Sequence, residues 1–258
     1  APLTAAEQDD LDGVPLIVGK ATARPMVSAP WMTGTKPRKM LNLASFNFTG
    51  LLEAPELTAQ AQEVLREYGV GSCSPPGFYG TSDMHMRLEE RLAAFVRRPA
   101  AIVYSQGLST ISSVIPAFCK RGDIIVADAG VNFAIQKGLQ LSRSTLYWYE
   151  HNNMDSLEIK LRQLNEQQAQ SKEPLTRRFI VSEALFEKYG SIANLPRLVE
   201  LKSKYKFRLM LDESYSMGVL GATGRGLTEA QSVCPDDVDF ITVSYTHLTL
   251  PTICSVSI

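Results

Sequence analysis

The chain has 258 residues, of which 45% are hydrophobic and 21% charged. These globular values exclude a disordered or collagen-like chain, and the length favours one large α/β domain. Its 26 basic and 27 acidic residues leave a formal charge of -1, so nothing indicates the clustered positive charge of a nucleic-acid-binding surface.

The start of the chain shows no membrane or secretion signal. No apolar run is long enough to span a bilayer, and residues 1–20 lack the basic start and apolar stretch of a signal peptide. Because the chain starts at Ala1 and not at Met, an anchor upstream of Ala1 stays open. Residues 1–40 carry five prolines and little periodicity, which predicts an extended lead-in over the surface.

Two helices are predicted next. Over residues 55–68, Pro55 stands at a favourable first helical position and Gly69 follows the end. Over 83–97, apolar residues recur at helical spacing.

From residue 101 onward, short apolar runs alternate with helical patterns. This alternation predicts parallel strands joined by right-handed helical crossovers, and the lack of polar alternation predicts strands covered on both faces. After the first strand a helix is expected to run to about Phe118, and further helices are expected at 132–141, 154–169 and 195–205. The expected strands lie at 101–105, 123–128, 145–150, 178–184, 208–214 and 239–244.

Ligands of such sheets bind beyond the carboxyl ends of the strands. The residues that follow the predicted strands are Gln106–Ser109, Asp128–Ala129, Glu183 and Asp212–Ser214. At the first of these places, Ser109 and Thr110 suit a phosphate at a helix start, although ordinary helix capping explains them more simply. Asp212 suits a protonated ring nitrogen of a cofactor, and the alternative is a solvated loop acid or a helix cap.

Other motifs are less specific. The glycines of GVLGATGRG (218–226) match neither nucleotide fingerprint and predict tight turns and a close approach of the backbone. The loop GVGSCSPPGFYGT (69–81) contains Phe78 and Tyr79, which must pack on something, either a subunit contact or the interior of the monomer. The histidines and cysteines show no metal spacing: His85, His151, His247, Cys73, Cys119, Cys234 and Cys254.

Taken together and in order, these segments resemble the α-oxoamine synthases. The likeness covers about residues 41–244 and rests on LNLASFNFTGLL (41–52), YGVGSCSPPGFYGTSDMHMRLEERLAAF (68–95), YSQGLST (104–110) and LDESYSMGVLGATGRG (211–226). The resemblance implies a pyridoxal-phosphate (PLP) transferase of fold type I, with a mostly parallel sheet covered by helices. Members condense an amino acid with an acyl-CoA.

The resemblance also implies a degenerate cofactor site. Catalytic members place a histidine over the cofactor ring where this chain has Asn132, and a second histidine where it has Tyr215. Asp212 keeps the place of the ring-nitrogen partner. The family's covalent lysine would fall at His247, and no lysine follows Lys206. The implied cofactor-site positions are Gln106, Gly107, Leu108, Asn132, Asp212 and Tyr215.

Within the family, GFYGTSDMHMRLEERLA, KRGDIIV and SYSMGVLGATGRGLTE resemble a non-catalytic subunit. That resemblance implies a heterodimer with a lysine-bearing catalytic subunit that holds PLP covalently. The complex would condense L-serine with palmitoyl-CoA to 3-ketosphinganine at the endoplasmic reticulum membrane, facing the cytosol and attached through a segment not present here. The implied contribution to the partner's active site comes from Cys73, Phe78, Tyr79, Gly80 and Thr81.

The end of the chain departs from the family. Residues 245–258 contain no acid and no base except His247, which predicts a foreign tail or a domain cut short before its C-terminal small domain. The expected organisation is thus a lead-in over 1–40, an incomplete large domain over 41–244 and an atypical tail. Three alternatives stay open: a catalytic synthase whose lysine is lost by truncation, a pure scaffold, and a non-enzymatic nucleotide-binding protein.

Overall fold

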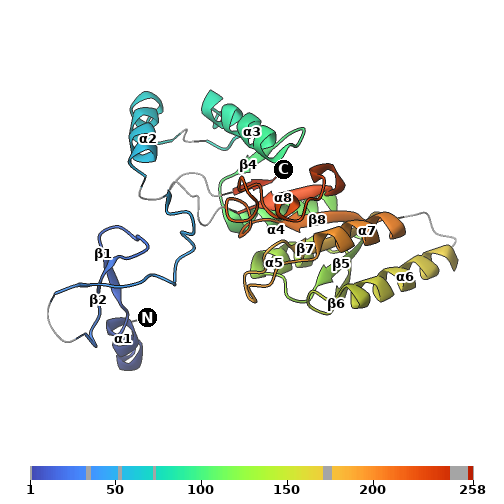
Figure 1. Cartoon of the computed structure of the whole chain (residues 1–258), viewed down its shortest axis with the longest axis horizontal. Coiled ribbons are helices and arrows are strands. Elements are labelled where there is room, and N and C mark those ends of the chain that lie inside the picture. Colours follow the sequence, from blue (N-terminus) through green and yellow to red (C-terminus); the bar gives the residue numbers. More distant parts are fainter. Residues whose placement is uncertain are drawn as a thin grey trace. The chain divides into compact units, whose positions relative to one another are not determined.

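A computed structural model of the chain describes residues 2–32, 36–51, 54–71, 74–170, 176–244 and 255–257. The chain divides into two compact units, Ala1–Gly71 and Ser72–Ile258, called unit 1 and unit 2 below (Figure 1). The predicted domain boundaries after residues 40 and 244 stay predictions. Within the described residues, no helix combines the length and apolarity that crossing a bilayer needs.

Unit 1 corrects the expectation of an extended lead-in over residues 1–40. The helix α1 (Ala5–Asp12) precedes a small antiparallel sheet in the order β1-β2-β3. The α1 helix is held by a capping box, in which the Thr4 backbone N–H donates to the Glu7 carboxylate and the Glu7 N–H donates to the Thr4 hydroxyl. Because α1 buries no residue, it carries no apolar periodicity that a sequence search would detect. The strands are β1 (Leu16–Val18), β2 (Met26–Ser28) and β3 (Arg38–Lys39).

The second helix of unit 1 confirms its prediction. Helix α2 spans Pro55–Tyr68, with Pro55 in the first turn. Gly69 follows at φ 79°, in the left-handed region that favours glycine.

Unit 2 is built on a seven-stranded sheet in the order β4-β10-β9-β8-β7-β5-β6. The pairs formed among β5, β6, β7, β8 and β9 are all parallel, as predicted. Strand β10 runs antiparallel to both of its neighbours, so β4 points the same way as β9. The strands are β4 (Ile102–Tyr104), β5 (Ile124–Asp128), β6 (Thr145–Tyr149), β7 (Arg178–Glu183), β8 (Arg208–Asp212), β9 (Phe240–Val243) and β10 (Ser255–Ser257).

Helices connect these strands as the alternating pattern predicted. Helix α4 packs against α5, and α6 packs against α7 (Figure 1). The connections through α4 and α5 run along the sheet toward β6, whereas those through α6 and α7 run back toward β8. Because such crossovers are right-handed, the helix pair α4 and α5 covers one face of the sheet and the pair α6 and α7 covers the other. The helices are α3 (Asp83–Val96), α4 (Gly107–Phe118), α5 (Phe133–Ser142), α6 (Met154–Gln170), α7 (Leu195–Tyr205) and the short α8 (Leu227–Ala230) and η2 (Pro235–Asp237).

The core lies between the sheet and these helices. All six residues of β7 are buried, in agreement with a strand covered on both faces. Gly138 of α5 lets α4 approach closely, since a Cβ there would stand 2.9 Å from the Ile111 carbonyl oxygen. The strands other than β10 end at one common edge of the sheet, where Asp128, Glu183 and Asp212 close β5, β7 and β8.

Candidate functional site

The carboxyl edge of the sheet gathers polar side chains that are far apart in sequence. Asp212 is 5% exposed and Glu183 only 1% exposed, and their Cα atoms are register partners on neighbouring strands. Asn132 begins α5 directly above them. With Ser214, these residues form a hydrogen-bonded group that we call the edge cluster.

Asp212 is the centre of the edge cluster. Its Oδ1 accepts hydrogen bonds from the Ser214 N–H (3.1 Å) and the Ser214 hydroxyl, and its Oδ2 accepts one from the Asn132 side-chain amide (3.0 Å). Burial raises the pKa of Asp212, and these hydrogen bonds oppose the shift. The Ser214 hydroxyl in turn accepts the Ser244 N–H (2.8 Å) from the end of β9.

Asn132 makes three contacts at once. Its Oδ1 caps α5 by accepting the Ile135 N–H (3.0 Å), its Nδ2 donates to Asp212, and its backbone N–H donates to Glu183. The side-chain amide therefore uses both its N–H donor and its oxygen acceptor in hydrogen bonds within the protein. It serves as a helix cap and a tether between α5 and β8.

Glu183 is the member to which sequence analysis gave no role. Its two carboxylate oxygens accept the backbone N–H groups of Asn132 and Glu187. Burial, reinforced by the nearby Asp212 charge, raises the pKa of Glu183 to about 8. Its only sequence signal was its place at the end of an apolar strand.

Glu213 follows Asp212 in sequence but serves a different purpose. Its carboxylate accepts the Leu227 N–H (2.9 Å) and the Ser216 hydroxyl. Burial raises the pKa of Glu213 to about 7. Gly226 lies against it at φ 82°, and a Cβ there would stand 2.4 Å from Oε2. Glycine is therefore required in GVLGATGRG for a close approach, as the sequence predicted in general terms.

Tyr215 lies beside the edge cluster and is 8% exposed. Burial, together with a hydrogen bond to the Glu187 side chain, raises the pKa of the Tyr215 phenol. Since the Glu187 N–H binds Glu183, Tyr215 is joined to the cluster through the β7 loop. The structure thus brings together Asn132, Asp212 and Tyr215, three of the predicted positions.

The other three predicted positions begin α4. Gln106 is the N-cap residue, but its side chain makes no capping hydrogen bond. The Ser109 and Thr110 hydroxyls instead donate back to the Gln106 carbonyl (2.8 and 2.9 Å). The simple capping explanation for these two hydroxyls was therefore wrong.

A second polar network lies farther along the edge. The buried Asp128 accepts hydrogen bonds from the Gly130 N–H (2.6 Å) and the Asn152 N–H (2.8 Å) and contacts His151 Nδ1 (2.8 Å). His151 Nε2 contacts the Ser191 hydroxyl (2.8 Å). The network ties together the loops after β5, β6 and β7. No group of potential metal ligands occurs among the described residues.

The predicted interface loop lies at the start of unit 2. Phe78 and Tyr79 are 72% and 79% exposed and pack on each other, with ring centroids 4.4 Å apart. Burial of this pair inside the monomer, one of the two alternatives, was wrong. Gly80 is buried under the turn, where a Cβ would stand 1.8 Å from the Ser74 carbonyl oxygen, and Thr81 donates to the Pro76 carbonyl (2.7 Å). Cys73 lies outside the described residues.

Comparison with known proteins identifies the fold family. The model of the aminotransferase class I and II family matches residues 38–246. The chain belongs to that family. This result confirms the PLP-transferase type of fold that the sequence resemblance implied.

Two curated relatives match this aminotransferase-family chain over about four-fifths of its length. "Serine palmitoyltransferase 1" of Dictyostelium discoideum is 49% identical over 81% of this chain and 43% of the relative. "Long chain base biosynthesis protein 1" of Arabidopsis thaliana is 48% identical over 83% of this chain and 44% of the relative. The chain therefore spans less than half the length of these two relatives.

Solved structures of the same fold agree. A serine palmitoyltransferase from Sphingomonas wittichii superposes with a TM-score of 0.83 at 24% identity, over 98% of this chain and 61% of that one. An 8-amino-7-oxononanoate synthase from Francisella tularensis superposes with a TM-score of 0.63, at 24% identity over 83% of this chain and 56% of that one. Another solved serine palmitoyltransferase with a TM-score of 0.83 and 23% identity contains PLP.

The four described residues of the edge cluster in this family member include an acid but no lysine amine that could hold PLP covalently. The acid Asp212 is present, but Asn132 offers an amide where a stacking ring is needed, and that amide is already engaged. No lysine among the described residues hydrogen bonds to Asp212 or Glu183, and a histidine cannot replace the amine.

Proposed function

We propose that the chain is part of the non-catalytic subunit of serine palmitoyltransferase. Its complex carries out the decarboxylative condensation of L-serine with palmitoyl-CoA to 3-ketosphinganine, the first product of sphingolipid biosynthesis. The catalytic partner, long-chain-base subunit 2, holds the PLP through its own lysine. The chain works at the endoplasmic reticulum membrane, with the domain facing the cytosol and attachment through a segment outside residues 1–258.

The observation that carries this proposal is the engagement of Asn132. Its amide bridges the α5 cap and Asp212, so it uses the acid that the family keeps for the cofactor nitrogen. An amide with a structural role at this position supports the view that the former cofactor site now stabilises the fold. The names of the relatives from Dictyostelium and Arabidopsis support the same assignment.

The contribution of this chain to the partner comes from the loop around Phe78 and Tyr79. The turn is closed by hydrogen bonds from the Phe78 and Gly80 N–H groups to the Pro75 carbonyl (3.0 and 3.1 Å). It therefore presents two exposed aromatic rings on a defined backbone. Exposed aromatic side chains are typical anchors of subunit interfaces. We infer that the rings, with Cys73 and Thr81, form part of the wall of the partner's active site.

The decisive experiment uses the full-length subunit co-expressed with its catalytic partner. Phe78→Ser with Tyr79→Ser is expected to lower the condensation rate by roughly tenfold to a hundredfold, because misplaced substrates lose proximity. The PLP absorbance of the complex is expected to stay unchanged. Ile159→Ser, which removes a 48% exposed apolar side chain from α6, is the matched control and is expected to keep full activity.

A second measurement tests the non-catalytic role itself. The full-length subunit without its partner is mixed with PLP and scanned for the absorbance of a lysine-bound cofactor. We expect no such band. A band that disappears when a lysine of this subunit is replaced would make the chain a catalytic synthase. An unchanged rate in the loop variant would instead reduce the chain to a scaffold.

A further inference from the structure

Four parallel strands of unit 2 begin in segments that are rich in basic residues. We call these segments, which lead into β5, β6, β7 and β8, the basic edge; they are 118–123, 142–145, 176–178 and 205–208. Together they contain seven basic residues and one acid, Asp123. The segments at the other ends of the same strands contain six acids, one lysine and no arginine; they are 128–131, 149–152, 183–188 and 212–215. Unit 2 is therefore polarised, with its positive charge at the edge of the sheet opposite the edge cluster.

The segments of the basic edge lie side by side. In the sheet, β6, β5, β7 and β8 are neighbours in that order, and all their pairs are parallel. The Ser144 hydroxyl donates to the Lys120 carbonyl (3.0 Å), and the Ile124 N–H donates to the Arg177 carbonyl (3.0 Å). Arg208 begins β8, one strand farther along. Since neighbouring strands are about 4.8 Å apart, the four strand starts form a row about 15 Å wide.

Most cations of the basic edge face solvent without a counter-charge. Six of the seven are exposed: Lys120, Arg121, Arg143, Arg177, Lys206 and Arg208. Within the described part of the chain, Arg177 is the only one of these six that forms an ion pair, and its partner is Asp123. Neighbouring strand starts lie within a Debye length of about 8–10 Å, so the remaining charges repel one another. An anionic surface placed against the row would relieve this repulsion.

Helix capping accounts for only part of the row. Arg143 and Lys206 follow the ends of α5 and α7, where a cation interacts favourably with the helix dipole. Both caps have left-handed φ angles, 55° and 59°, at which glycine is the usual residue. Arg208 belongs to β8, and Arg121 lies in a turn. Neither of these two stands at a helix cap, so helix ends do not explain their charge.

Apolar side chains are exposed among these cations. Leu141, two residues before Arg143, is 61% exposed, and Phe118, two residues before Lys120, is 41% exposed. They lie in the last turns of α5 and α4, two helices that pack against each other. Exposed apolar side chains combined with lysine and arginine are typical of surfaces that bind at the membrane interface.

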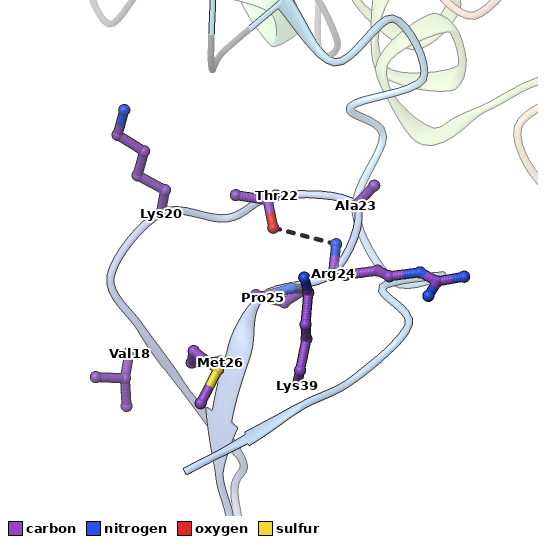
Figure 2. Close-up of a pocket in the computed structure, with 8 residues that line it drawn as sticks. All are labelled: Val18, Lys20, Thr22, Ala23, Arg24, Pro25, Met26 and Lys39. Carbon is purple, nitrogen blue, oxygen red and sulfur yellow. Dashed lines mark hydrogen bonds between the residues drawn. The ribbon is translucent and has the colours of Figure 1, made fainter.

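The small sheet of unit 1 shows a different arrangement of charge. Lys20 and Arg24 lie on opposite sides of an open depression beside β1 and β2, and their charged ends point away from each other (Figure 2). This pair therefore does not form a row like that of unit 2.

We propose that the basic edge docks unit 2 on a membrane surface that carries anionic lipids. Such a surface presents mobile negative headgroups over its whole area, so cations spread over four strands need not converge on one anion. Phe118 and Leu141 contact the boundary between headgroups and acyl chains. A soluble acidic partner would offer these two side chains no apolar phase. The inference adds a second membrane contact, made by the domain itself, and does not depend on the proposed function, since its test needs neither the catalytic partner nor PLP.

The test measures binding of the 258-residue chain to lipid vesicles in a flotation assay. The probes are vesicles of phosphatidylcholine, with and without one-third phosphatidylserine. We expect binding to the anionic vesicles, weakened by added salt, and none to phosphatidylcholine alone. Replacing Arg121, Arg143 and Arg208 with Gln is expected to weaken the binding by about fivefold per charge, or about a hundredfold in total.

The control separates the basic edge from general positive charge. Replacing Arg91, Lys137 and Lys188 with Gln removes three exposed cations of unit 2 that lie outside the basic edge, and is expected to leave binding unchanged. Circular dichroism checks that both triple variants keep the fold. The proposal fails if the anionic vesicles do not bind the chain, or if the two triple variants weaken binding equally.

A milder variant tests the lipid assignment itself. Leu141→Ser removes an apolar side chain beside the row and is expected to weaken vesicle binding by about threefold or more. Ile159→Ser, on α6, is the matched control and is expected to leave binding unchanged. Poly-glutamate is titrated in parallel as a soluble polyanion. If poly-glutamate binds as tightly as the anionic vesicles and Leu141→Ser has no effect, the partner is an acidic protein and the membrane proposal is overturned.

Discussion

Unit 2 buries many of its apolar side chains, whereas unit 1 leaves most of its own exposed. In unit 2 the strands and helices enclose side chains such as Phe179, Leu198 and Ile125 that have no exposed area. In the described part of unit 1, Pro25 and Val27 are the buried residues, and Leu16 remains 65% exposed. A three-stranded sheet this small cannot enclose a core of its own. Stability therefore resides in unit 2, and unit 1 presents surface.

The most direct test of this difference between the units is the same Leu→Ala substitution made once in each unit. Leu198→Ala in α7 is expected to lower the free energy of unfolding by about 2–5 kcal/mol, because it leaves a cavity in the core. Leu16→Ala in β1 is expected to cost less than about 0.5 kcal/mol. Denaturant unfolding followed by tryptophan fluorescence measures both, with Trp31 in unit 1 and Trp148 in unit 2. An equal loss would show that Leu16 is covered in the folded chain.

The two units also differ in buried acidic groups, because unit 2 encloses carboxyl groups whose titration affects its stability. With the pKa of Glu183 raised from 4.5 to about 8, the folded chain holds protons that the unfolded chain has released. The free energy of unfolding is therefore expected to fall as the pH rises from about 4.5 to 8, by up to about 1.4 kcal/mol per pH unit and a few kcal/mol in all. Glu213, with its pKa raised to about 7, acts in the same direction.

Unfolding curves across this pH range measure the effect. Glu183→Gln is expected to flatten the pH dependence, since the amide carries no titrating charge. Glu166→Gln, an exposed change on α6, serves as the control and is expected to keep the slope. A slope as steep in the Glu183 variant as in the unaltered chain would assign the pH dependence to other groups, such as Glu213.

The smallest expected effect compares two helix caps. Asn132→Ala removes the cap of α5 and the contact with Asp212, and is expected to cost about 1–2 kcal/mol of unfolding free energy. Thr4→Ala removes the capping box of α1, which buries nothing, and is expected to fray that helix alone. Hydrogen exchange resolves the two, with faster exchange confined to α1 in the second variant. If Thr4→Ala destabilised the whole chain, the conclusion that stability resides in unit 2 would be contradicted.

Most elements of unit 2, and helix α2 of unit 1, were predictable from local pattern. Apolar runs without polar alternation predicted β5, β7 and β8, and Pro55 with Gly69 bounded α2 correctly. The elements of unit 1 before residue 40 were missed. There α1 is held by a cap and the strands are two or three residues long, so neither leaves an apolar period to detect.

The candidate site divides in the same way. The sequence by itself determined that Phe78 and Tyr79 lie on a glycine-rich loop, and its family resemblance implied that Asn132, Asp212 and Tyr215 occupy the places of a degenerate cofactor site. Only the tertiary structure decided that Asn132 is bound to Asp212, that Glu183 joins them, and that the loop aromatics are exposed. The spacing of residues in the sequence indicates only which residues are neighbours within one helical turn or along one strand. Burial, and the pKa shifts that follow from it, depend on segments that meet only when the sheet forms.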